Sequence, residues 1–473
     1  MSTRLLFSVL VFACAVFGQR KTPELVPTAL LKRLREGVSA VAEVRLPPTE
    51  EPVRIESLDP QGRPIDTVVG PRGSDSRVFV GVGDASQGVV TGRIRVHLPG
   101  GPWEADVRVS GADPGWVMHL NPGFHYDPVW WNTQADYAEH GARLEGHQGP
   151  GITLVEEYLA FLEREPAAKA VLHQLPYVKT FLEAKPRRRA ELLAAVAAGR
   201  MVAVGGSYNE FSSTLIGPEA SLRNLASGSR WTEEMFGGAS DTTWQCDVFG
   251  HDPSFPSLIA GAGKKFTAFA RGPFHQWGVL HELAGGARGG MNFPSEFWWM
   301  GPDGKRVFTH YMPGHYGYAY ARLARGRNDA PAFERAETIV GTMFEDLRGM
   351  ALTHHIMLPM HEDFVRPLRG LGELVERWNA KWASPTLVID APKDFFAAVM
   401  KEVEERKIPV PSISRDMNPI YTGCGVSFID LKLAQRLAET RLRDAEGLSV
   451  LAAAGVAGRR GHAHDAASVE RAW

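Results

Sequence analysis

The stretch that decides the fold is Thr242–His251, which reads TTWQCDVFGH. A short apolar run ends in a carboxylate, Asp247, which is typical of a buried strand leading into a polar loop. A carboxylate at such a position can act as a nucleophile or a metal ligand, or it can cap the next helix. Because Asp252, followed by Pro253 and Ser254, suits the capping role better, we expect Asp247 to be chemically active.

Similar units lie on the N-terminal side of this stretch. Residues 154–164 and 187–200 have the apolar spacing of helices, and residues 117–120 and 201–204 are short apolar runs. Strands that alternate with helices predict a parallel β-sheet, and ligands bind beyond the carboxyl ends of the strands of such sheets. The polar motifs described below all follow predicted strands.

The whole chain is predicted to be an α/β protein with three folded parts. A small β-rich module covers residues 25–110, where short alternating runs are separated by Pro and Gly. A parallel-sheet catalytic domain flanked by helices follows over 112–400. Residues 412–473 are expected to form the start of a helical bundle, with one long amphipathic helix from Leu431 to Ala454.

Residues 1–20 resemble a secretory signal peptide. Arg4 precedes an apolar run from Leu5 to Phe17 that is too short to span a bilayer. The predicted location is therefore secreted or periplasmic, with a lipid anchor at Cys14 as an alternative. Cys246 and Cys424 remain after cleavage and do not form a disulfide framework. We expect Cys246 to have a packing role.

Composition excludes some classes of partner. The chain has 473 residues and a net charge of -2, which does not favour nucleic-acid binding. No other apolar run is long enough for a membrane span.

The pair His125 and Asp127 is the first candidate metal site. In an extended segment, residues i and i+2 point to the same side, so both side chains can approach one cation. Imidazole and carboxylate suit zinc or a similar divalent ion. The alternative is a solvated loop pair. Trp130 and Trp131 favour the site, because aromatic faces beside polar groups are common where sugars bind.

Two further motifs follow predicted strands. Glu210 comes after Gly205 and Gly206, which allow a tight turn; it can bind sugar hydroxyls or be structural. The run His361-Glu362-Asp363 can supply an acid, a hydroxyl ligand or a metal contact, or it can be only a polar loop.

Together these segments, from about His119 to the C-terminus, resemble glycoside hydrolase family 38, the retaining α-mannosidases. The motifs that match the family are His125-x-Asp127, Gly205-Gly206, Trp244–His251, Asp303-Gly304-x-x-Val307, Asp363-Phe364, and Asn418–Gly423 with the helix that follows.

The resemblance implies hydrolysis of terminal α-mannosidic linkages in mannose-containing glycans, with Zn²⁺ or another divalent cation as cofactor. It makes Asp247 the nucleophile and a metal ligand, with His125 and Asp127 as co-ligands. Trp130, Glu210, His361 and Asp363 are the expected substrate-binding residues. A retaining glycosidase also needs a second carboxyl group about 5 Å from the nucleophile as acid and base.

The chain departs from the family pattern in three places. The acid/base is not identified, with Asp329, Glu362 and Asp363 as candidates. Ser212 and Ser213 stand where members often have an aspartate. The family's histidine after the long helix is not matched before Trp473, and neither His462 nor His464 is assigned to it, so a truncated chain is expected. A polysaccharide deacetylase using His125 and Asp127, and an inactive carbohydrate-binding remnant, stay open as alternatives.

Overall fold

The computed structural model describes residues 22–73, 76–110, 113–130, 133–140, 149–274, 279–280, 291–324, 330–419, 425–454 and 465–473. The predicted signal peptide with Cys14 lies outside these ranges, as do Trp131, Asp329, Cys424, His462 and His464. The chain divides into two compact units, Met1–Asp113 and Pro114–Trp473. Within the described ranges, no helix combines the length and the apolar character that crossing a membrane requires.

The first unit is built from antiparallel strands. β1, β2 and β5 pair in that order, and β4, β3, β6 and β7 pair in a second sheet. Alternate side chains point inward, and Val41, Ile55, Val80 and Ile94 are fully buried. The strands are β1 (Glu24–Leu34), β2 (Gly37–Arg45), β3 (Val53–Leu58), β4 (Pro64–Gly70), β5 (Arg77–Asp84), β6 (Val89–Leu98) and β7 (Gly101–Ser110), with the short helix η1 (Ala85–Gln87).

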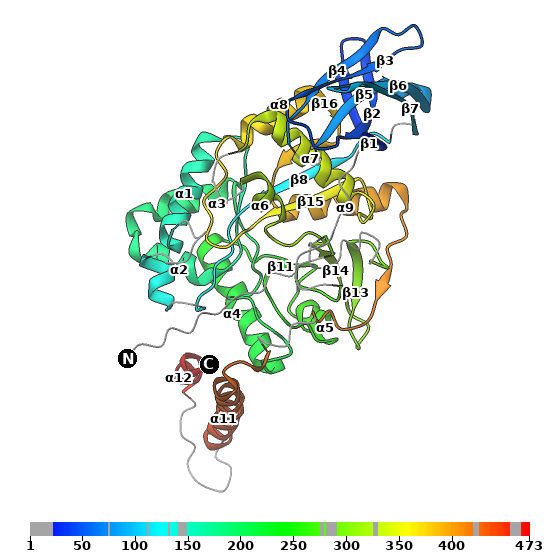
Figure 1. The fold of residues 1–473 in the computed structure, drawn as a ribbon. Helices are drawn as coiled ribbons and strands as arrows, with labels where there is room; N and C mark the ends of the chain where they lie inside the picture. Colours follow the sequence, from blue (N-terminus) through cyan, green and yellow to red (C-terminus); the bar gives the residue numbers. More distant parts are fainter. Residues whose placement is uncertain are drawn as a thin grey trace, which may run out of the picture. The chain divides into compact units, whose positions relative to one another are not determined.

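The second unit alternates strands and helices, as the sequence predicted (Figure 1). Its strands are β8 (Val117–Pro122), β9 (Ala170–Leu172), β10 (Met201–Ala203), β11 (Thr242–Gln245), β12 (Phe266–Phe269), β13 (Glu296–Met300), β14 (Arg306–Tyr311), β15 (His355–Met360), β16 (Trp382–Ser384), β17 (Thr386–Ile389) and β18 (Ser412–Ile413). Its helices are η2 (Asp136–His140), α1 (Gly151–Arg164), α2 (Leu175–Ala184), η3 (Pro186–Arg188), α3 (Arg189–Ala197), α4 (Pro218–Phe236), α5 (Phe255–Gly261), α6 (Tyr318–Ala324), α7 (Phe333–Leu347), α8 (Leu371–Lys381), α9 (Pro392–Arg406), α11 (Ile429–Ala453) and α12 (Ala466–Ala472).

Parallel pairing dominates the second unit. β8 lies between β15 and β17, β9 pairs with β10, and β12 lies between β11 and β14, all in parallel. β13 is the exception: it forms an antiparallel hairpin with β14, because Gly304 at φ 81° closes a tight turn. The predicted α/β class is confirmed, with an antiparallel strand that the sequence reading did not anticipate.

The core of this unit lies between the strands and α9. Trp244, Cys246 and Phe308 are fully buried and share a cluster with Phe395 and Phe396 of α9. Burial of a large apolar side chain contributes roughly 1.5–3 kcal/mol. Cys246 therefore does pack in the core, as expected.

The carboxylate of Asp390 ties β17 to β8. His119 Nδ1 lies 2.6 Å from Asp390 Oδ2, and Asn121 Nδ2 donates to Asp390 Oδ1 at 2.9 Å. Buried polar groups need such partners to offset desolvation. His119, with which the family resemblance begins, therefore helps to fix the register of the central strand.

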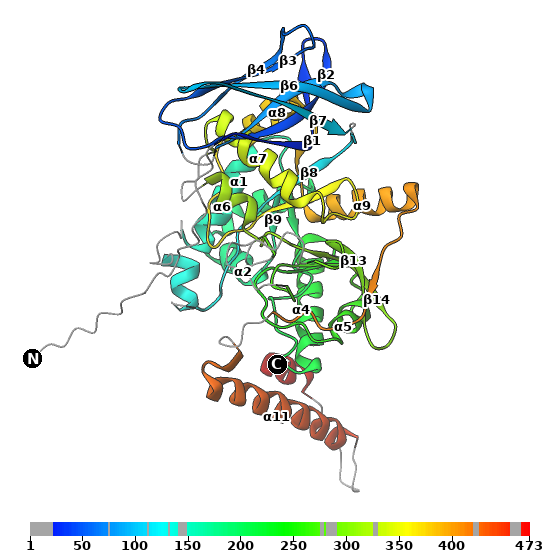
Figure 2. The ribbon, with the colours of Figure 1, turned by 45° about the vertical axis from the view of Figure 1, so that its right-hand side comes forward.

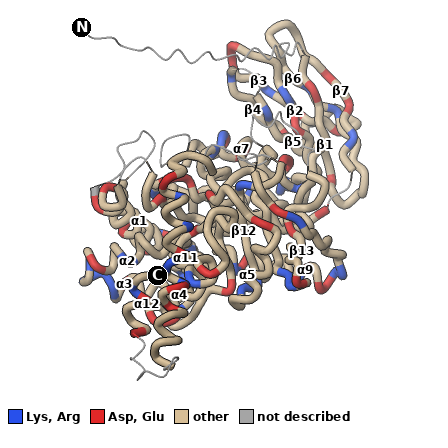
Figure 3. Tube along the Cα trace, turned by 90° about the horizontal axis from the view of Figure 1, so that it is seen from below, with Lys and Arg blue, Asp and Glu red and all other residues tan. Residues whose placement is uncertain are grey.

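The long helix α11 contacts the surface of α4 (Figure 2). The Gly217 amide donates to Glu439 Oε2 at 2.9 Å, and Arg223 pairs with Glu446 at 2.7 Å. The Arg223 guanidinium also covers the Trp473 ring at 4.4 Å. In Figure 3, basic and acidic segments are interspersed, which agrees with the small net charge.

Candidate active site

The side chains singled out in the sequence follow parallel strands, at the edge where the carboxyl ends of the strands meet. β8 leads into His125 and Asp127, β11 into Asp247, and β15 into Asp363. A parallel bridge joins His125 to Asp363: the Phe364 amide donates to His125 O at 3.0 Å. The fold therefore brings side chains from three strands into one place.

His125 is at the centre of this group. Its Nε2 lies 3.4 Å from Asp127 Oδ1 and 3.8 Å from Asp247 Oδ2. Burial opposes protonation of the ring, but the carboxylates of Asp127, Glu210 and Asp363 outweigh burial and raise the pKa of His125 well above its ordinary value. The imidazole is thus surrounded by negative charge, an environment that also attracts a metal cation.

The donor set fits a divalent ion. One ligand atom each from His125, Asp127 and Asp363 lies within 4.8 Å of the other two. Neither ring nitrogen of the buried His125 has a hydrogen-bond partner among the described residues. Imidazole nitrogen with carboxylate oxygens is a donor set used for zinc and similar ions. Asp247 stands beside this group through its contact with His125.

Asp247 is held by an arginine that the sequence analysis missed. Arg271 follows β12, is only 4% exposed, and pairs through Nε with Asp247 Oδ1. Its guanidinium also lies over the Phe249 ring at 4.6 Å. Burial raises the pKa of Asp247, while Arg271 and His125 act in the opposite direction. Oδ1 is therefore occupied, and Oδ2 is the oxygen that faces His125.

Glu210 holds the loop that carries Asp247. Its Oε1 accepts a hydrogen bond from the Cys246 amide at 3.0 Å, and its Oε2 accepts one from the Asp247 amide at 3.1 Å. Burial raises the pKa of Glu210 to about 7. Glu210 therefore positions the Asp247 backbone, whether or not it also meets a sugar hydroxyl.

Two adjacent carboxyl groups follow β15. The Tyr316 hydroxyl donates to Asp363 Oδ1 at 2.9 Å, and Asp363 is in the group with His125 and Asp127. Glu362 packs against Gly317, and burial raises its pKa to about 7. Tyr316 was not singled out in the sequence. Asp329, the third acid/base candidate, lies outside the described residues.

A cleft of about 170 Å³ gives access to these groups. His125, Asp127, Glu210 and Asp247 are among its lining residues. Of the other predicted contacts, Trp130 is 55% exposed, whereas His361 is fully buried. Sugar binding by Trp130 and His361 stays a prediction.

The last residue of the Trp244–His251 motif is structural. His251 is fully buried among the rings of Phe255, Phe269 and Trp299, at centroid distances of 5.1–5.9 Å. Burial lowers the pKa of His251 to about 3. Asp252 was expected to cap the next helix, but Ser254 is the N-cap of α5 and no side chain caps it; Asp252 Oδ1 instead accepts from the Ser254 amide at 2.8 Å.

Replacing His251 with phenylalanine should make the free energy of unfolding less dependent on pH below pH 6.5. Below pH 6.5 the His251 imidazole is protonated in the unfolded chain but stays neutral in the folded chain. The free energy of unfolding therefore falls as the pH drops from 6.5 toward 3. By pH 5 this costs about 2 kcal/mol. Urea unfolding of His251→Phe and wild type at pH 7 and pH 5 measures the difference, and equal pH slopes would contradict it.

The sequence also matches known proteins. Residues 115–423 match the glycosyl hydrolases family 38 N-terminal domain. The chain is 23% identical over 350 residues to Alpha-mannosidase 2C1 of Mus musculus, covering 73% of this chain and 30% of that protein. It is 23% identical to Alpha-mannosidase F of Dictyostelium discoideum, covering 71% of this chain and 34% of that protein.

The fold agrees with these matches. The structure of an alpha-mannosidase from Enterococcus faecalis V583 superposes with a TM-score of 0.52 and 19% identity, covering 64% of this chain and 31% of that one. This chain thus spans about a third of the length of these relatives. The matched range contains the parallel strands and every candidate site residue, and the chain belongs to glycosyl hydrolase family 38 through its N-terminal domain.

Proposed function

We propose that this chain hydrolyses terminal α-mannosidic linkages in glycans, with retention of configuration and with Asp247 as the nucleophile. The observation that carries the proposal is the pairing of Asp247 Oδ1 with Arg271, which leaves Oδ2 facing His125 beside the cleft. A buried carboxylate held in one orientation is pre-organised for attack on an anomeric carbon. The names of the relatives support α-mannosides as the substrate class.

The remaining groups have distinct tasks in this proposal. His125, Asp127 and Asp247 would hold the cation, with Asp363 adjacent. When bound, a divalent ion orients substrate oxygens and stabilises negative charge. Glu210 keeps the Asp247 amide in place, and Trp130 offers an exposed aromatic face to the sugar. Secretion or a periplasmic location is part of the proposal and rests on the run that follows Arg4.

We assign the acid/base role to Asp363. Two contacts favour it over Glu362: its backbone pairs with that of His125, and the Tyr316 hydroxyl donates to its Oδ1. As a general acid it would protonate the glycosidic oxygen, and as a general base it would then take a proton from water. The raised pKa of Glu362 makes that neighbour the appropriate control.

The function is tested with the purified full chain and a panel of nitrophenyl glycosides. We expect turnover of the α-mannoside but not of the β-mannoside or α-glucoside, with α-mannose as the first product in proton NMR. Chelation should remove turnover and Zn²⁺ should restore it. Acetate release from acetylated polysaccharide would instead support a deacetylase. Mannoside binding without turnover by the zinc-loaded chain would support a binding protein.

Asp363→Asn should make the rate depend strongly on the leaving group. Loss of the general acid should slow hydrolysis of a methyl α-mannoside by about 10²- to 10³-fold. With dinitrophenyl α-mannoside, whose leaving group needs no proton, the rate of the first step should fall far less. Added azide should then react with the intermediate and yield a mannosyl azide. Steady-state and burst kinetics on both substrates measure this, with Glu362→Gln alongside. The assignment moves to Glu362 if only that variant shows the pattern.

A further inference from the structure

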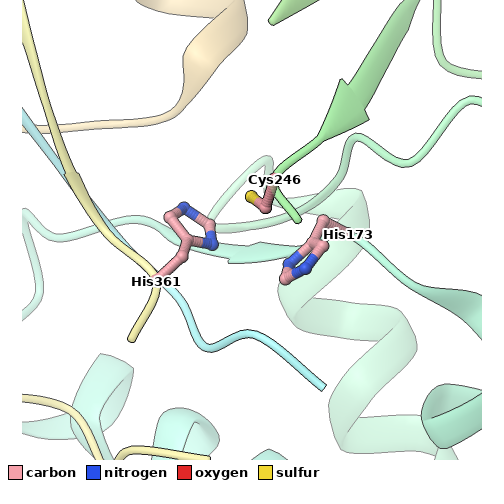
Figure 4. Close-up of side chains that lie close together, drawn as sticks. All are labelled: His173, Cys246 and His361. Carbon is pink, nitrogen blue, oxygen red and sulfur yellow. The ribbon is translucent and has the colours of Figure 1, made fainter. Parts of the chain in front are cut away.

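A second cluster of potential metal ligands lies beside the first, and its His173 ring stacks on the His125 ring at a centroid distance of 5.8 Å. His173 follows β9, Cys246 follows β11 and His361 follows β15 (Figure 4). One donor atom from each lies within 4.8 Å of the other two. Cys246 and His361 are fully buried and His173 is 1% exposed. The cluster shares no residue with His125, Asp127 and Asp247.

The two imidazoles have ring nitrogens that nothing in the described protein satisfies. Nδ1 and Nε2 of both His173 and His361 are buried without a hydrogen-bond partner among the described residues. Glu210 Oε1 lies 3.6 Å from His173 Nε2, and one donor atom each from His125, His173 and Glu210 also lies within 4.8 Å of the other two. A buried polar group without a partner costs about 1–3 kcal/mol. One such nitrogen from each ring, together with the thiol, points to a ligand that all three side chains share.

The backbone around the cluster holds these rings in place. Gly123 lies against the His361 ring, so that a Cβ there would come 2.6 Å from Nδ1. Trp244 packs on the same ring at a centroid distance of 5.3 Å. The His173 amide donates a hydrogen bond to the Tyr177 hydroxyl at 3.2 Å, which fixes the backbone of His173. The His173 and His361 rings also contact each other edge to face at a centroid distance of 5.2 Å, so packing holds the donors close together.

We propose that His173, Cys246 and His361 form a second metal site that binds Zn²⁺ through two imidazole nitrogens and a thiolate. Such a donor set matches tetrahedral zinc, with Glu210 Oε1, 3.6 Å from His173 Nε2, available as a further donor. Thiolate ligation selects zinc over magnesium or calcium. On binding, the thiol proton of Cys246 passes to the buffer and its sulfur forms the metal bond. Zinc bonds of 2.0–2.3 Å would draw the donors about an ångström closer together.

The site has a consequence for the neighbouring residue. A metal bond at Cys246 fixes the residue directly before Asp247, whose amide is already held by Glu210. The carboxylate of Glu210 and the thiolate of Cys246 together balance the two positive charges of the ion. This second ion is structural, and the inference does not rest on mannoside hydrolysis.

Cobalt titration of the metal-free full chain tests the proposal without an activity assay. Wild type should bind two equivalents of Co²⁺ and develop a thiolate-to-cobalt charge-transfer band. Cys246→Ser should lose one equivalent and the band. Asp127→Asn, which alters only the first site, should keep the band, as should Cys14→Ser and Cys424→Ser. A wild type without the band, or a band that survives Cys246→Ser, overturns the proposal.

X-ray absorption at the zinc edge keeps the test valid if Cys246→Ser does not fold. The sample is the Asp127→Asn chain with Cys14 and Cys424 replaced by serine and one equivalent of Zn²⁺ added. We expect one sulfur neighbour at about 2.3 Å and imidazole nitrogens at about 2.0 Å. A shell of oxygen and nitrogen without sulfur rejects the site.

Discussion

Asp247→Asn should lower kcat for nitrophenyl α-mannoside by about 10⁴-fold, the loss expected when a residue of a catalytic unit is removed. Asparagine has the same shape and can still accept from Arg271, but it lacks the nucleophilic oxygen and the negative charge. It would also remove a proposed metal ligand next to His125. Initial rates on protein with matched zinc content measure the loss, and circular dichroism checks the fold.

Asp241→Asn is the matched control for this variant. Asp241 directly precedes the same strand, β11, and its side chain is 45% exposed. Exposed substitutions usually change energies by less than about 0.5 kcal/mol, so the rate should stay within about twofold of wild type. Similar rates for Asp247→Asn and wild type would remove Asp247 from the mechanism and leave only a metal or packing role.

Gly228→Ala should destabilise the second unit by about 3 kcal/mol, at the upper end of the range for overpacking. Alanine normally stabilises a helix relative to glycine. Here a Cβ would overlap the Ser207 carbonyl carbon and the Tyr208 nitrogen, which are backbone atoms that cannot rotate away. The Tyr208 amide donates to Asn224 O of α4 at 3.0 Å, so the clash would separate this segment from its helix.

Gly447→Ala is the control for the helix. Gly447 is also in a helix interior, in α11, but a Cβ there meets nothing within 4 Å. That variant should gain about 0.5–1 kcal/mol in the stability of its helix. Denaturant unfolding of both variants separates packing from helix propensity. A stable Gly228→Ala chain with full zinc binding would show that the Ser207–Glu210 segment can move without harm.

The sequence could predict those site residues that directly follow a strand of a parallel sheet. His125, Asp127 and Asp247 each follow a short apolar run, and parallel strands place such residues at one edge of a sheet. The long helix was also found where its apolar spacing placed it, from Ile429 to Ala453. These features depend on local patterns, which a single sequence carries.

What the sequence could not give depends on partners far along the chain. Arg271 follows a short apolar run at residues 266–270, so the same reasoning could have identified it as a strand-end residue. Its pairing with Asp247 could not be predicted, because it depends on β11 and β12 being neighbours in the sheet. Which of Glu362 and Asp363 joins His125 depends on the register between β8 and β15. A shift of one residue would exchange their sides.

The arginine on Asp247 has a consequence for anomeric selectivity. A free carboxylate rotates about its last bond, and its two oxygens are interchangeable. In the proposed mechanism, the pairing of Oδ1 with Arg271 disfavours this rotation and leaves Oδ2 as the oxygen that would meet an anomeric carbon. A sugar of the opposite anomeric configuration would present its departing group to that oxygen instead of its open face. The orientation of this one carboxylate would then select which anomer of the substrate is cleaved, while the two successive displacements set the configuration of the product.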